Sequence, residues 1–183
     1  MGIDPKAEEP ARALLGHAIR HEWEAYVGVI QDVGEEGFLE CLSLYLRAAG
    51  YIAIDACGHR WPSDAELREI ARQAAASELN LGVTELDVYE YLARCALGFG
   101  ALAHVFPDPE QAASVPVLAT AAMLVSYRGP GTEWWDYLEQ IELALAEASG
   151  LPENAFPAAL LLSRRNHALK EQGDSDQVTS QPR

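Results

Sequence analysis

The sequence predicts an all-α fold, a single-domain helical bundle of about seven helices. Apolar residues recur every three or four positions along most of the 183 residues, which is the spacing of one face of a helix. Alternation of the kind found in β-strands is confined to residues 51–54, and a lone strand has no partner with which to pair. Turns rich in Gly and Pro separate the helical segments.

The chain length suits one domain, which buries about 70% of the surface that its unfolded chain exposes. Such a domain needs neither a disulfide nor a metal to fold. We expect a flexible N-terminal segment at 1–9 and the helical domain at 10–172. The polar, apolar-poor end of the chain predicts a disordered tail at 173–183.

The first helix is expected at 10–34, because Pro10 suits a first helical turn and Gly34 a helix end. Its apolar residues form a seam with alternating spacings of three and four: Gly16, Ile19, Trp23, Tyr26, Ile30 and Val33. A seam of this kind packs along a second helix. We expect that helix to belong to the same chain, with a symmetric dimer as the less favoured alternative.

The second helix opens with Glu35 and Glu36, which suit the positive end of a helix dipole. Its apolar stripe continues through Gly50, so we expect one helix to Cys57, capped by Gly58. A break at Gly50 is the alternative. Glycine inside a helix costs only about 1 kcal/mol relative to alanine, so the stripe can prevail.

The third helix is expected at 63–80, because Ser63 and Glu66 form a capping box at its start. Thr84, with Asp87 three residues on, caps the next helix.

That helix extends into residues 95–106, which are apolar on all sides and therefore predicted to be buried. Pro107 and Pro109 then mark a stop and a restart. Pro116 either kinks the following helix or marks a second start. The run at 117–125 is so apolar that we expect it in the central helix of the bundle.

A turn at 128–131 precedes a helix that Thr132 is expected to cap and that ends near 150–152. A last helix is expected at 154–171.

Charge narrows the possible partners. The chain has 28 acidic and 13 basic residues, for a net charge of -15, which disfavours nucleic acid and anionic lipid. The longest nearly unbroken apolar run, 115–125, is shorter than the roughly 20 residues that cross a bilayer. The N-terminus lacks a secretory signal pattern, and the three cysteines are far apart, as in reduced cytoplasmic proteins. We therefore expect a cytoplasmic protein that is a monomer rather than a homodimer and binds neither nucleic acid nor membrane.

A candidate metal site consists of His17, His21 and Glu24. Offsets of four and three residues place them on one face of a helix, and imidazole and carboxylate groups are common metal ligands. Neither the HExxH pattern nor the paired Glu-x-x-His of di-iron bundles occurs. The alternative is a solvated face on which Arg20 and Glu24 pair. We expect no stoichiometric metal and no cofactor.

Other motifs are incomplete. Residues 82–92 resemble the second half of a DNA-binding helix-turn-helix, but the gap before them is too long and their exposed face is acidic. Residues 98–103 match a dinucleotide fingerprint by letter, without the strand that it requires. Cys57 and His59 lack an identifiable third group that would orient the histidine.

A candidate protein-binding patch lies in the stretch between Arg128 and Arg164, which contains no basic residue. Its members are Trp134, Trp135, Asp136, Glu139 and Glu142. The two adjacent tryptophans are about 100° apart on a helix, so they cannot easily both face inward. An aromatic residue beside acids suits a basic partner protein. The alternative is a solvated face with Trp135 under a neighbouring loop.

The leading hypothesis is therefore a non-enzymatic, acidic helical protein that binds a protein partner. The alternative is a metal-binding helical bundle or enzyme that uses His17, His21 and Glu24. The sequence resembles no family that would identify the partner or pathway.

Overall fold

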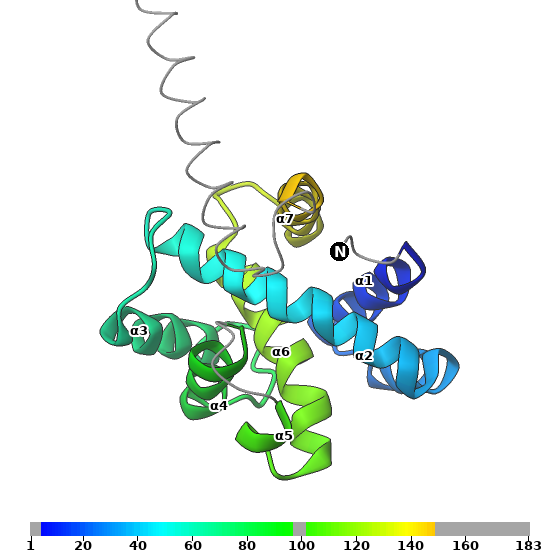
Figure 1. The fold of residues 1–183 in the computed structure, drawn as a ribbon. Helices are drawn as coiled ribbons and strands as arrows, with labels where there is room; N and C mark the ends of the chain where they lie inside the picture. The colour runs from blue at the N-terminus through cyan, green and yellow to red at the C-terminus, as the bar shows by residue number, and fades with distance from the viewer. Residues whose placement is uncertain (1–4, 97–101, 149–183) are drawn as a thin grey trace, which may run out of the picture.

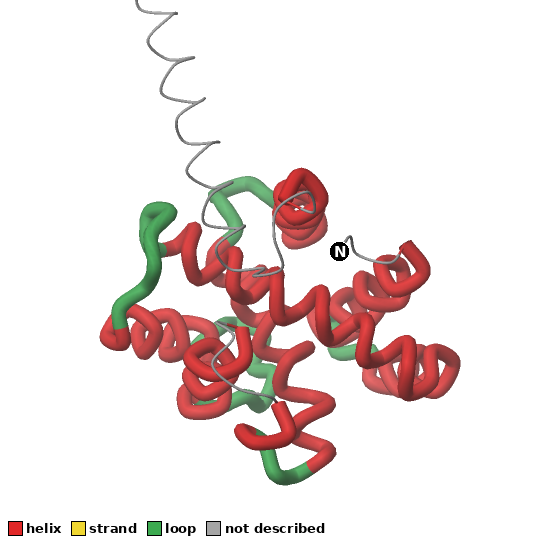
Figure 2. The backbone as a smooth tube through the Cα atoms, in the orientation of Figure 1, coloured by secondary structure: helices red, strands yellow, loops and turns green. Residues whose placement is uncertain are grey.

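The computed structural model describes residues 5–96 and 102–148. Across these residues the chain consists of helices joined by turns, without a strand, which confirms the all-α prediction (Figure 2). The elements in chain order are α1 (Pro5–Ile19), α2 (Trp23–Ala56), α3 (Asp64–Ala75), α4 (Glu85–Glu90), the π-helix η1 (Tyr91–Ala96), α5 (Leu102–Val105), α6 (Pro109–Tyr127) and α7 (Trp134–Ala148).

The two longest helices, α2 and α6, cross at the centre of the molecule (Figure 1). The helix α1 lies along α2, where the Tyr45 hydroxyl donates to the Ala11 carbonyl oxygen at 2.9 Å. On α6, Val117 and Leu124 are fully buried, which agrees with the predicted central helix. The buried hydroxyls of Tyr91 and Thr120 are paired there at 3.2 Å.

The expected continuous helix at 10–34 is wrong. The helix α1 begins at Pro5, five residues earlier, and ends at Ile19. The Glu22 N–H donates to the His17 carbonyl oxygen and the His21 N–H to that of Ala18, which is the Schellman pattern that ends a helix. His21 has φ 58°, the left-handed conformation that glycine usually supplies at this position.

The seam predicted for that helix is therefore divided between α1 and α2. Tyr26 is buried, and Ile30 packs against the core as expected. Trp23, however, remains 42% exposed because the chain reverses just before it.

The predicted passage of the second helix through Gly50 is confirmed. Gly50 is buried within α2, and Gly58, with φ 67°, follows the end of the helix. Gly34 marks a kink, with φ 68° and ψ -178°, and helix continues on both sides of it. The helix α2 is also long and apolar enough to cross a membrane by composition alone. Within α2, 56% of the 18-residue segment that meets this criterion is buried inside the bundle.

Both predicted caps, Ser63 and Thr84, are present, and each forms a capping box. The Ser63 hydroxyl accepts from the Glu66 N–H, and the Glu66 carboxylate accepts from the Ser63 N–H. Thr84 and Asp87 form the same reciprocal pair at the start of α4. The third helix ends at Ala75, before the expected residue 80.

The later elements also depart from expectation. The α4 helix passes into the π-helix η1 at Tyr91. No second start occurs at Pro116, which lies inside the single helix α6. Thr132 does not cap α7, because it belongs to the preceding turn and donates its N–H to the Gly129 carbonyl oxygen. Part of the stretch at 95–106, the helix expected at 154–171 and the tail at 173–183 lie outside the described residues.

Candidate functional site

The candidate metal site assumed that His17, His21 and Glu24 lie on one continuous helix, and this assumption is wrong. His17 lies in the last turn of α1, His21 occupies the turn that follows, and Glu24 lies in the first turn of α2. Across the described parts of the chain, no group of three His, Cys, Asp or Glu side chains is arranged to hold a metal ion.

Glu22, which the sequence reasoning did not single out, organises this turn. Its carboxylate lies 2.6 Å from Nδ1 of His17 and 3.0 Å from Nε of Arg20. Hydrogen bonds from His17 and Arg20 hold the pKa of Glu22 below its ordinary value. The ring of His21 instead forms a T-shaped contact with the ring of Trp23. These contacts hold the chain reversal together and leave Arg20 paired with Glu22 rather than with Glu24.

The predicted protein-binding residues divide into two groups. Trp135, Asp136 and Glu139 are exposed on α7, with 51% of Trp135 accessible to solvent. Leu143, which the sequence reasoning did not include, joins them with 61% exposed. We call these four residues the acidic aromatic face. Trp134 packs inward, so the prediction that the two tryptophans point in different directions is correct.

Glu142 belongs to the fold rather than to this face. Its carboxylate is buried and accepts two hydrogen bonds from the Arg12 guanidinium of α1, one of them from Nε to Oε1 at 3.1 Å. Burial raises the pKa of Glu142, while its pairing with Arg12 opposes that rise. This ion pair attaches α7 to α1.

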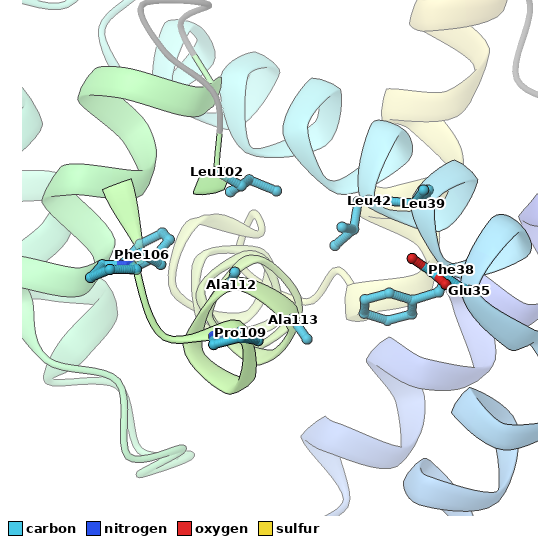
Figure 3. A pocket seen from close by; sticks show the side chains of 10 residues that line it. Glu35, Phe38, Leu39, Leu42, Leu102, Phe106, Pro109, Ala112 and Ala113 are labelled. Atoms are coloured by element: carbon cyan, nitrogen blue, oxygen red, sulfur yellow. The ribbon is translucent and has the colours of Figure 1, made fainter. Parts of the chain in front are cut away.

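A hollowed surface, which we call the apolar groove, has a volume of about 490 Å³. It lies between three elements: the part of α2 that directly follows the kink at Gly34, the short helix α5, and the start of α6. Its lining residues are Glu35, Phe38, Leu39, Leu42, Leu102, Phe106, Pro107, Pro109, Ala112 and Ala113. Side chains from these three elements converge on the hollow (Figure 3).

The exposed fractions of the lining residues show which of them lie deep in the groove and which lie at its edge. Leu42 and Phe106 are almost wholly buried at 7% and 5% exposure, whereas Leu39 at the edge is 58% exposed. Sequence patterns could not reveal this site, because no local motif shows which three helices meet. The only available signal was the pair of prolines around Asp108, which breaks the helix so that α5 and α6 can flank a space.

A polar cluster at the end of α2 contains a residue pair considered from the sequence. Asp55 accepts a hydrogen bond from the Tyr137 hydroxyl at 3.0 Å and lies 3.3 Å from Nδ1 of His59. Asp55 is thus the orienting carboxylate that the sequence did not identify for His59. Burial raises the pKa of the nearby Cys57 thiol, which favours the protonated form over the thiolate that a nucleophile requires.

Comparisons with protein-family models, curated proteins and solved structures found no match to this chain.

Proposed function

We propose that this protein is a non-enzymatic helical interaction protein whose acidic aromatic face binds a basic segment of a partner protein. The observation that carries the proposal is the exposure of Trp135 and Leu143 on the same side of α7 as two carboxylates. Offsets of one, four and eight residues keep the four side chains within roughly a 100° arc of the helix.

The composition of this face suits recognition. Tryptophan is enriched among the residues that dominate binding energy at protein interfaces, because its large ring buries much apolar surface at little entropic cost. Asp136 and Glu139 add negative charge beside it, in a stretch of chain that lacks basic residues from 129 to 163. A net charge of -15 further favours encounter with a basic partner.

The setting of the face also fits the proposal. Trp134 and Tyr137 pack into the core and the Arg12–Glu142 pair fixes the helix, so Trp135 is displayed on a supported element. Cys41 and Cys57 are free thiols, which fits the reduced cytoplasm that we propose as its location.

The test is quantitative capture of partners from a lysate of the native host. One variant combines Trp135→Ser with Leu143→Ser. The matched control combines Trp61→Ser with Leu86→Ser, which removes the same side-chain types from other elements, where they are 40% and 63% exposed. We expect a partner that wild type and control retain, that the face variant loses, and that added salt releases.

The retained partner must then bind the purified chain directly and show the same dependence on Trp135 and Leu143. Equal capture by the face variant and the control, or capture of nothing by the wild type, would contradict the proposal.

A further inference from the structure

The apolar groove has the size and lining of a small-molecule site. Ligand pockets commonly measure about 300–1,000 Å³, and this hollow measures about 490 Å³. Nine of its ten lining residues are apolar. A ligand with a hydrocarbon or aromatic body would remove Leu39 and the deeper surfaces of Phe38 and Leu102 from water.

The negative charge at the groove favours a ligand with a positive charge. Glu35 is the one ionisable residue among the described residues that line it, and it sits beside Phe38 at the mouth (Figure 3). An anionic head group would meet repulsion here, whereas a cation would gain attraction.

The aromatic residues strengthen that preference. Phe38 and Phe106 lie on different sides of the hollow, from α2 and from the segment before α6. Aromatic ring faces attract ammonium groups, which makes aromatic residues combined with a carboxylate a favourable environment for organic cations.

We propose that the apolar groove binds a small amphipathic organic cation, with its ammonium group at Glu35 and its apolar body between Phe38, Leu102 and Phe106. This site is separate from the acidic aromatic face and does not depend on the function proposed for that face.

The experiment compares two probes of equal chain length and opposite charge, octyltrimethylammonium and octanoate, by calorimetric titration of the full chain. We expect the ammonium compound to bind about tenfold more tightly than the carboxylate. Glu35→Gln should abolish this preference. Glu36→Gln, which removes the same charge from the adjacent exposed position outside the lining, should preserve it.

Amide chemical shifts in the same titration locate the probe. Binding in the groove should perturb Leu42, Leu102 and Ala113 and leave Leu143 on α7 unchanged. Circular dichroism confirms that each variant keeps its helical content.

Several results would overturn the proposal. These are absence of binding, equal affinity for the two probes, equal losses in the two glutamine variants, or shifts confined to α7. Displacement of the ammonium probe from Leu42 and Ala113 by a basic amphipathic peptide of higher affinity would instead assign the groove to a protein partner. The test of the acidic aromatic face stands apart from all of these outcomes, because its face variant changes residues of α7 alone.

Discussion

Among single residues, Glu142 carries the clearest energetic consequence. Its buried carboxylate depends on the Arg12 guanidinium. Arg12→Ala removes those donors and leaves a buried charge without its partner, so we expect a loss of about 1–3 kcal/mol in the free energy of unfolding, measured with urea at neutral pH. Arg72→Ala is the control, because its pair with Glu69 is exposed on both sides and should contribute less than about 1 kcal/mol.

The pH dependence of that loss has a definite sign. Burial raises the pKa of folded Glu142 above its value in the unfolded chain, and Arg12 opposes that rise. A raised pKa means that stability is fully present below the unfolded value and is lost as the pH rises through the folded one. Without Arg12 the folded pKa rises further. The effect of Arg12→Ala should therefore shrink when unfolding is measured near pH 4, where the carboxyl is protonated. A constant effect across this range would contradict the assignment.

Sequence reasoning at the residue level succeeded where the chemistry is local. Ser63 and Thr84 were identified as caps because their hydroxyls bond to N–H groups only three residues away. The adjacency of Trp134 and Trp135 showed that both cannot easily face inward, but it did not show whether a loop covers Trp135, which is 51% exposed. Glu142 was assigned to the surface, because its partner Arg12 is 130 positions away and no local pattern signals the contact.

At the scale of the element, two glycines of α2 should respond oppositely to alanine. Gly34 has φ 68°, a conformation that an L side chain resists, while an added Cβ would meet no atom within 4 Å. Gly34→Ala should therefore cost about 1–2 kcal/mol through backbone strain alone.

Gly28 lies in the same helix and also has open space around an added Cβ, without the unusual backbone angle. Gly28→Ala should stabilise the protein by about 0.5–1 kcal/mol, since alanine loses less conformational freedom in a helix. Thermal unfolding of the two variants checks both signs. A shift in the same direction for both would show that the kink at Gly34 is not a fixed feature of the backbone.

Helix ends explain most of the differences between the predicted and observed elements. The turn at Gly58 was anticipated because glycine commonly follows a helix end. The turn at His21 has the same hydrogen-bond pattern but uses a histidine, held by Glu22, so the apolar seam running through it indicated an uninterrupted helix. The predicted placement of His17, His21 and Glu24 on one helix face depended on that uninterrupted helix.

At the scale of the whole molecule, net charge governs association. The chain carries 15 more acidic than basic charges, since 28 minus 13 is 15. Phosphate contacts require clustered cations, so we expect no shift of duplex DNA at micromolar protein and about 150 mM salt. Electrophoretic mobility with a long duplex tests this. Salt-sensitive micromolar binding that is lost when Arg164 and Arg165 are replaced by alanine would refute it.

The bundle class was predictable because helical periodicity extends along most of the chain. The apolar groove was not, because it depends on how α5 and the starts of two long helices meet. Its lining residues come from positions 35 to 113, and each appears in the sequence as an ordinary member of a helix or a turn.

The length of α6 bears on whether a ligand in the apolar groove and a partner on α7 affect each other's binding. Its 19 residues span roughly 28 Å, with the apolar groove at its first turns and α7 following its last (Figure 1). The two surfaces share no residue, and the packed interior of the bundle separates them, in which Val117 and Leu124 of α6 are fully buried. We expect additive binding free energies: octyltrimethylammonium should have the same dissociation constant whether or not a partner occupies α7. By reciprocity, the partner's affinity for this protein should be the same with and without bound octyltrimethylammonium.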